Sequence, residues 1–212
     1  RRMNSPAASA APAQQLQTIA VAGNPNSGKT AIFNTLTGLR QKVANYPGVT
    51  VEKREGSLTG TDITLLDLPG AYSLSARSPD EEIARDVLMG RVEGTQRPDA
   101  VLIVIDASNL ERNLYLATQI LDTRTPAIVA CNRMDLAEER GLHIDCARLA
   151  VRLGVPVLPT IATQKRGIEE LRRALAHGKL PDGASRSWEF PPAYEEIIIR
   201  IASVIGESGR VP

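Results

Sequence analysis

A glycine-rich loop at residues 23–30 (GNPNSGKT) limits the fold of this chain more than any other part of the sequence. It lies between residues 18–22, an apolar run with the length of a buried strand, and residues 30–38, which repeat apolar side chains at helical spacing. Glycines there let successive backbone N–H groups face phosphate oxygens, and the helix N-terminus adds its positive end. We therefore predict a phosphate-binding loop in which Lys29 bridges the β- and γ-phosphates and the Thr30 hydroxyl binds Mg²⁺. The alternative is a glycine-rich turn with an exposed lysine.

The rest of the chain alternates strand-like and helix-like segments. A capping box that begins at Ser78, with a proline at the first helical position, predicts a helix that runs to about Met89. The alternation predicts an α/β fold with a mostly parallel six-stranded sheet and helices on both faces, which binds its ligands at the carboxyl ends of the strands. We expect strands at residues 18–22, 49–58, 63–66, 101–105, 127–131 and 155–158, and further helices at 30–38, 111–121, 144–153 and 167–175.

The two ends of the chain differ in composition from its centre. We interpret residues 1–15 as a flexible tail, residues 16–178 as the folded domain, and residues 179–212 as a linker and the truncated start of a helical subdomain. No apolar run approaches the roughly 20 residues of a membrane helix. The 25 Lys and Arg residues balance 24 Asp and Glu residues, so the charge predicts no nucleic-acid partner. Cys131 and Cys146 are interpreted as core residues rather than a disulfide or metal ligands.

Two further motifs follow strand-like segments. In residues 67–70 (DLPG), Asp67 is expected in the Mg²⁺ shell and the Gly70 N–H at the γ-phosphate. In residues 132–135 (NRMD), Asp135 can accept hydrogen bonds from guanine N1–H and the 2-amino group, whereas adenine offers neither donor. Asn132 would support the site, and Arg133 could stack on the base where other such motifs carry lysine. The alternative is a helix-capping asparagine and a surface aspartate.

A third segment of the expected base site departs from the usual Ser-Ala pattern. Residues 161–163 (IAT) keep Ala162, whose N–H can reach the guanine oxygen, but lack the serine that braces the loop. We hypothesise that nucleotide affinity is modest or release is fast. The residues expected to contact the nucleotide are Gly23, Asn24, Pro25, Asn26, Ser27, Gly28, Lys29, Thr30, Ala31, Asn132, Arg133, Asp135, Ile161, Ala162 and Thr163.

These motifs, in this order, identify a GTPase with a Ras-like P-loop fold, and the residues around them resemble one family. Residues 45–52 (NYPGVTVE), 67–74 (DLPGAYSL), 78–82 (SPDEE) and 106–116 (DASNLERNLYL) are similar to the cytosolic G domain of the bacterial ferrous-iron transporter family FeoB. The resemblance covers about residues 18–175. It implies a regulatory domain that binds GTP and GDP and hydrolyses GTP slowly.

The resemblance also implies particular ligands and partners. Thr50 would be the threonine that closes on Mg²⁺ and the γ-phosphate, and Asn26 the asparagine that binds a K⁺ ion beside the phosphates. For Asn26 the alternative is a turn residue. The implied partners are the permease domain of the same transporter and small cytosolic regulatory proteins, at the cytoplasmic face of the bacterial inner membrane. The oligomeric state stays open.

The position after DLPG bears on the mechanism. Ras-like proteins orient the attacking water with a glutamine there, but this chain has Ala71. Hydrolysis would therefore depend on electrostatics around the phosphates and on backbone groups, with catalytic roles for Asn26, Lys29, Thr50 and Gly70. Two other functions remain open from the sequence: a free ribosome-assembly GTPase, and a nucleotide sensor without significant turnover.

Overall fold

The structure, a computed structural model, describes residues 16–38, 41–76, 78–177 and 179–182. The predicted tail at residues 1–15 and the predicted helix in the last segment lie outside this range. The strands are β1 (Thr18–Gly23), β2 (Gln41–Asn45), β3 (Glu52–Ser57), β4 (Thr64–Asp67), β5 (Ala100–Asp106), β6 (Ala127–Asn132) and β7 (Val157–Pro159). The α-helices are α1 (Lys29–Thr37), α2 (Pro79–Leu88), α3 (Leu110–Asp122), α4 (Met134–Glu139), α5 (Cys146–Leu153) and α6 (Ile168–His177).

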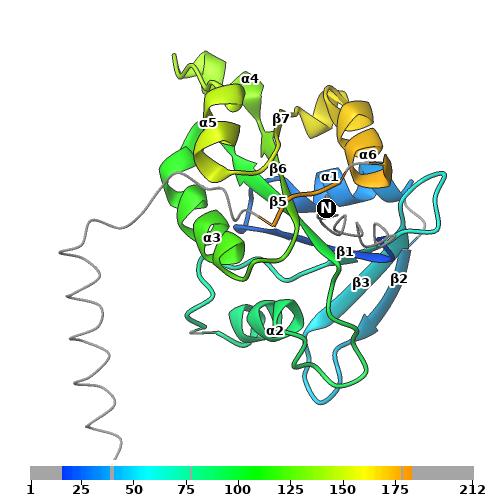
Figure 1. Cartoon of the computed structure of the whole chain (residues 1–212). Helices are drawn as coiled ribbons and strands as arrows, with labels where there is room; N and C mark the ends of the chain where they lie inside the picture. Colours follow the sequence, from blue (N-terminus) through cyan, green and yellow to red (C-terminus); the bar gives the residue numbers. More distant parts are fainter. Residues whose placement is uncertain (1–15, 39–40, 77, 178, 183–212) are drawn as a thin grey trace, which may run out of the picture.

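One mixed sheet forms the centre of the described chain, in the order β2-β3-β4-β1-β5-β6-β7 (Figure 1). Strands β4, β1, β5, β6 and β7 pair in parallel, whereas β3 is antiparallel to both β2 and β4. The sheet therefore has seven strands, and the prediction of six was wrong. The missed strand, β2, is an edge strand of sequence QKVAN that is mostly exposed, so it carries no apolar run by which a sequence pattern could identify it. The short helix α4 was also not predicted.

Both faces of the central strands β1, β5 and β6 are buried, and their side chains alternate between two cores. Ala20 and Ala22 of β1 face one core, and Ile19 and Val21 face the other. The first core packs against α2, α3, α4 and α5, and the second packs against α1 and α6, as the arrangement in Figure 1 shows. Burial on both faces explains why the central strands read as nearly continuous apolar runs.

The helix ends agree with the sequence signals. The Ser78 hydroxyl accepts a hydrogen bond from the Glu81 N–H at 3.3 Å, and Pro79 is the first residue of α2. Gly38 and Gly154 end α1 and α5 in left-handed conformations, with φ angles of 61° and 70°. Both glycines lie at the ends of the helices that the sequence predicts at residues 30–38 and 144–153.

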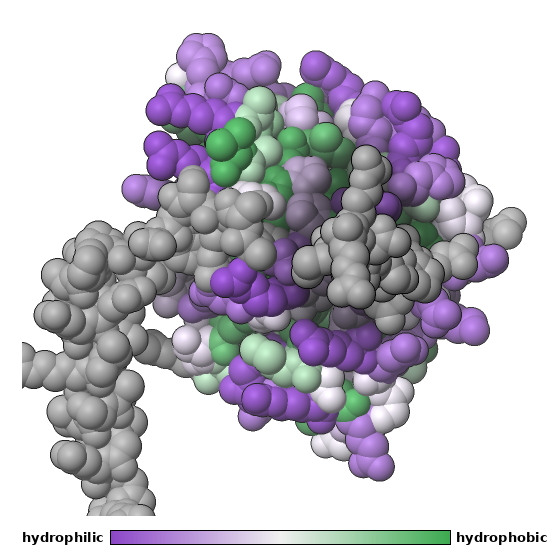
Figure 2. All heavy atoms as spheres, in the orientation of Figure 1, coloured by the Kyte–Doolittle hydropathy of each residue, from purple (hydrophilic) through white to green (hydrophobic). Residues whose placement is uncertain are grey.

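The two cysteines pack in the same core and are free thiols. Cys131 is buried in β6, and a hydrogen bond with Cys146 together with burial raises the pKa of the Cys131 thiol. Their interpretation as core residues agrees with this packing. Hydrophilic side chains dominate the rim of the face in Figure 2, with apolar side chains in smaller groups between them. Among the described residues, no helix combines the length and the apolar character needed to cross a membrane.

Candidate nucleotide-binding site

The glycine-rich loop joins β1 to α1 at the carboxyl edge of the parallel strands, where the sequence placed it. Gly28 precedes α1 with a φ of 87°, and a Cβ atom there would lie 2.2 Å from Nδ2 of Asn132. At Gly23 a Cβ atom would lie 2.5 Å from the carbonyl oxygen of Val104 in β5. Both positions therefore require glycine, because any side chain would push the loop away from its neighbours.

Asn132 connects the glycine-rich loop to the loop after β7. Its side chain is buried, and its Nδ2 donates to the carbonyl of Ser27 at 3.0 Å. Its Oδ1 accepts from the N–H of Ala162 at 3.1 Å and from the Thr160 hydroxyl at 3.4 Å. Thr160 was not among the predicted site residues. The sequence did show a hydroxyl residue two positions before Ala162. The Thr160 hydroxyl supports the loop through Asn132, where the usual serine is missing.

A pocket of about 350 Å³ lies beside this asparagine, at the place that the sequence assigns to the base. Asp135 lines this pocket, and its carboxylate accepts a hydrogen bond from Nε2 of Gln164 at 3.4 Å. The N–H of Ala162, which we expected at the guanine oxygen, donates to Asn132 in this structure. The pocket is lined by Gly28, Ala31, Asn132, Arg133, Asp135, Leu136, Ile161, Ala162 and Thr163.

Lys29 and Asp67 meet at the other end of the loop. The Lys29 ammonium forms an ion pair with the carboxylate of Asp67, which ends β4 and is buried. Burial raises the pKa of the Asp67 carboxyl above its ordinary value, and the charge of Lys29 opposes that rise. Within the described chain, no group of three or more His, Cys, Asp or Glu side chains gathers to hold a metal. The carboxylate of Asp67 and the hydroxyl of Thr30 are nevertheless hard oxygen donors of the kind that Mg²⁺ takes, so these residues fit that ion.

The segment after Asp67 packs directly on the glycine-rich loop. The Ala71 N–H donates to the carbonyl of Gly23 at 3.3 Å, and a Cβ atom on Gly70 would lie 3.1 Å from Pro25. Further along, the side-chain oxygen Oε1 of Gln119 in α3 accepts from the Leu74 N–H at 2.8 Å. Sequence reasoning did not identify Gln119, because nothing in the helix pattern distinguishes it from other polar positions.

Two predicted residues lie apart from these contacts. Thr50 is exposed between β2 and β3, and no hydrogen bond joins it to the glycine-rich loop in the part of the chain that the structure describes. Asn26 is exposed on the loop with a φ of 66°, a conformation that asparagine tolerates better than most residues. Both remain predictions with respect to their ions.

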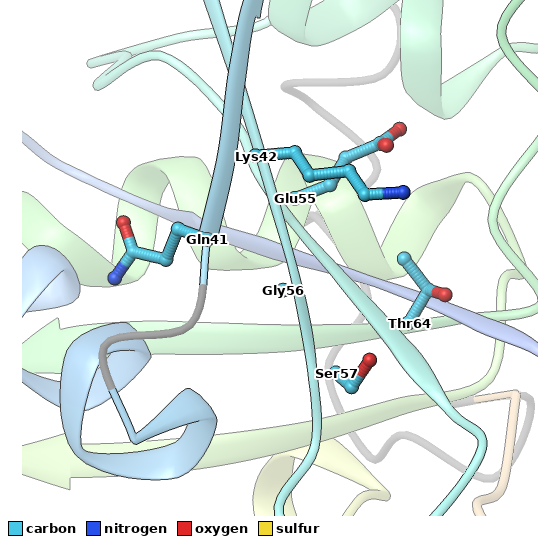
Figure 3. Close-up of a pocket in the computed structure, with 6 residues that line it drawn as sticks. All are labelled: Gln41, Lys42, Glu55, Gly56, Ser57 and Thr64. Carbon is cyan, nitrogen blue, oxygen red and sulfur yellow. The ribbon is translucent and has the colours of Figure 1, made fainter.

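A second hollow, also of about 350 Å³, lies on the antiparallel strands β2, β3 and β4 (Figure 3). Its lining is polar, with Lys42 of β2 beside Glu55 of β3. None of the predicted site residues lines it. We therefore assign the nucleotide to the pocket beside Asn132.

The fold and these segments define a class of protein. A phosphate loop after the first strand, an Asp-x-x-Gly segment after a neighbouring strand and an Asn-x-x-Asp pocket after β6 occupy one edge of a mixed sheet, which is the arrangement of a P-loop G domain.

Comparison with known proteins narrows this class to one family. Residues 17–175 match the family described as Ferrous iron transport protein B, and the chain belongs to this family. It is 49% identical over 164 residues to the Fe(2+) transporter FeoB of Shigella flexneri and 50% identical over 164 residues to that of Salmonella typhimurium. These matches cover 74% of this chain but only 21% of each relative, so the chain spans about a fifth of their length.

Solved structures agree with the Ras-like fold. A GDP-bound mutant of S. thermophilus NFeoB is similar with a TM-score of 0.75 and 40% identity, over 93% of this chain and 74% of that one. The G domain of the T. maritima FeoB iron transporter is similar with a TM-score of 0.67 and 44% identity, over 76% of this chain and 98% of that one. The expected family and the Ras-like G-domain fold are thus confirmed.

Proposed function

We propose that this chain is the guanine-nucleotide-binding domain of a ferrous-iron transporter and that it hydrolyses GTP slowly at the cytoplasmic face of the membrane. The observation that carries the proposal is the position of Asn132, which bonds to the phosphate loop through Ser27 and to the base loop through Ala162. One nucleotide could therefore lie across both parts. The relatives that are named as Fe(2+) transporters, and the GDP bound to a solved relative, support the same conclusion.

Each part of the chain has a distinct task in this proposal. Asp135 accepts hydrogen bonds from the guanine edge, which adenine could not provide. Lys29 leaves its ion pair with Asp67 to bind phosphate oxygens, and Asp67 and Thr30 then become available to hold Mg²⁺. The metal, when bound, neutralises charge on the phosphates. The backbone N–H groups of the loop hold the phosphates in place.

Hydrolysis would proceed without the side-chain amide that Ras-like proteins use. Ala71 is buried and its N–H is bonded to the Gly23 carbonyl, so it offers neither a side-chain amide nor a free N–H to a water molecule. Water would instead be oriented by backbone groups of the segment around Thr50, and Asn26 would hold a K⁺ ion that adds positive charge beside the phosphates. Without the side-chain amide we expect slow turnover. The permease domain of the full-length transporter would be the partner that responds to the nucleotide state.

The first test is the choice of nucleotide. We expect the purified chain to bind GDP and GTP at least about a hundredfold more tightly than ATP, because the adenine edge offers the Asp135 carboxylate no donor and leaves it unmatched beneath the bound base. Asp135→Asn should reduce this preference, with Asp62→Asn, in the exposed turn between β3 and β4, as a control outside the pocket. Equal binding of ATP and GTP by the unmodified protein would refute the guanine assignment.

The second test separates an enzyme from a sensor. Phosphate release from GTP is measured in K⁺ and in Na⁺ buffer, with Mg²⁺ present and with Mg²⁺ removed by a chelator. We expect release that needs Mg²⁺ and is faster in K⁺, and we expect Asn26→Ala to abolish the difference between K⁺ and Na⁺. Binding of GTP with no phosphate release would instead favour the sensor.

A further inference from the structure

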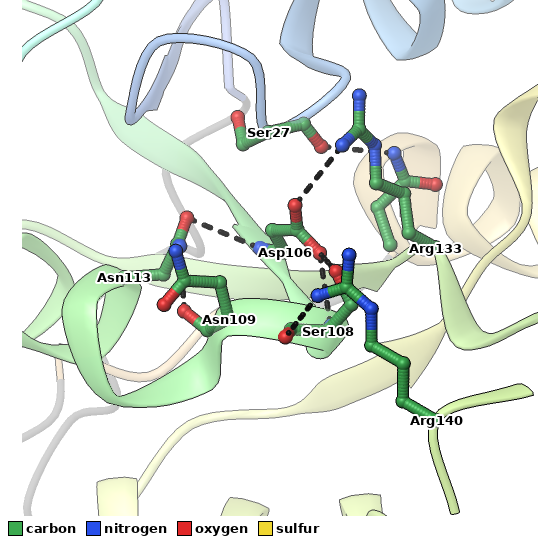
Figure 4. Close-up of polar contacts among 8 residues, drawn as sticks. Ser27, Asp106, Ser108, Asn109, Asn113, Arg133 and Arg140 are labelled. Carbon is green, nitrogen blue, oxygen red and sulfur yellow. Dashed lines mark hydrogen bonds and ion pairs between the residues drawn. The ribbon is translucent and has the colours of Figure 1, made fainter. Parts of the chain in front are cut away.

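An ion pair lies behind one wall of the base pocket. Arg133, which lines the pocket, places its Nη1 at 3.1 Å from Oδ2 of Asp106 (Figure 4). Asp106 ends β5 and does not line the pocket itself. The backbone of Arg133 has a φ of 61° at the start of α4, so its side chain leaves the chain from a left-handed turn rather than from the helix. The direction of the guanidinium therefore depends on what holds its far end.

Asp106 is itself fixed by a network of hydrogen bonds. Its Oδ1 accepts from the N–H of Ser108 at 2.9 Å and from the Ser108 hydroxyl at 2.7 Å. Its own N–H donates to Oδ1 of Asn113 at 3.1 Å, and Nδ2 of Asn113 donates to the carbonyl of Asn109 at 2.8 Å. The residue is only 7% exposed. One carboxylate oxygen is thus fully used within its own loop, which directs the other toward Arg133.

We propose that Asp106 is a positioning residue for nucleotide binding, which holds the guanidinium plane of Arg133 as a wall on which the guanine ring stacks. The proposal rests on the proposed function of the pocket. A planar guanidinium stacks well on an aromatic face, and an arginine that is already held loses less rotamer freedom when the base binds. Asp106 should therefore tighten nucleotide binding without contacting the nucleotide.

The proposed contact involves the face of the base and not its edge. Asp135 reads the guanine edge, whereas a stacked guanidinium interacts with any purine ring. IDP lacks the 2-amino group of GDP. Removing the charge of Asp106 should therefore weaken the binding of GDP and the binding of IDP by the same factor. Changes at Asp135 should alter the ratio between these two nucleotides. This difference separates a positioning role from a role in base choice.

A double-mutant cycle on the full chain tests the proposal. The dissociation constant of a fluorescent GDP is measured for the unmodified protein, Asp106→Asn, Arg133→Met and the double variant. We expect Asp106→Asn to raise the constant about three- to tenfold when Arg133 is present, which corresponds to one side chain that must be ordered on binding, and less than about twofold in the Arg133→Met background. A role in folding alone would give the same loss in both backgrounds, and that result would overturn the proposal.

Two further variants complete the design. Asp62→Asn, in the exposed turn between β3 and β4, is the matched control and should leave GDP binding unchanged. Arg133→Lys keeps the positive charge but offers no plane, so it should weaken GDP about as much as Arg133→Met does, and it answers the question even if Asp106→Asn does not fold. Unchanged binding by Arg133→Lys would overturn the proposal. Failure of the unmodified protein to bind GDP would refute the proposed function instead.

Discussion

Replacement of Asn132 by alanine should destabilise the protein even in the absence of nucleotide. The side chain supplies the partner of two backbone groups in different loops, the Ser27 carbonyl at 3.0 Å and the Ala162 N–H at 3.1 Å. Each buried backbone group that loses its partner costs about 1–3 kcal/mol. Since water can reach part of this site from the adjacent pocket, we expect a loss of about 2–4 kcal/mol in the free energy of unfolding.

Urea denaturation of the nucleotide-free chain measures this loss directly. Asn109→Ala is the matched control, because Asn109 is exposed and its side chain makes no capping hydrogen bond. This substitution should change the free energy of unfolding by no more than about 0.5 kcal/mol. A repeat with GDP at about a hundred times its dissociation constant should stabilise the unmodified protein by about 2.7 kcal/mol and stabilise Asn132→Ala much less. If the free energy of unfolding of Asn132→Ala lies within about 0.5 kcal/mol of that of the unmodified protein, the reasoning that makes Asn132 the connection between the two loops is wrong.

Three other substitutions test separate parts of the structure. Gly28→Ala should lower the free energy of unfolding by about 2–4 kcal/mol in urea denaturation and weaken GDP binding. The reason is that φ at Gly28 is 87° and the new Cβ would lie 2.2 Å from Nδ2 of Asn132. Unchanged stability would contradict the loop geometry. Tyr46→Phe should raise the free energy of unfolding by up to about 1 kcal/mol, since the Tyr46 hydroxyl is buried without a hydrogen-bond partner among the described residues; a lower melting temperature would argue against this. Gln119→Ala should cost about 1 kcal/mol and speed amide hydrogen exchange at Leu74, whereas unchanged exchange would show that Gln119 does not hold that segment.

The local patterns of this chain predicted most of its elements, because those elements follow from short-range chemistry. The apolar runs of the central strands, the capping box at Ser78 and the terminating glycines Gly38 and Gly154 each act within a few residues. Strand β2 was missed because an exposed edge strand is selected by pairing with β3 and not by its own composition. The glycine-rich loop, in turn, was identified because its chemistry lies in one continuous stretch.

The site itself shows where this local chemistry ends. The motifs at residues 23–30, 67–70 and 132–135 can be read from the chain alone, since each carries a phosphate, metal or base contact within a few positions. No pattern indicated that Asn132 would bond to Ser27 across 105 residues, or that Asp106 would hold Arg133. Such contacts depend on which strands become neighbours in the sheet, because β5 and β6 bring their carboxyl ends together only when the whole sheet has formed. Residue types thus set the available chemistry, and long-range packing chose which of these groups face one another.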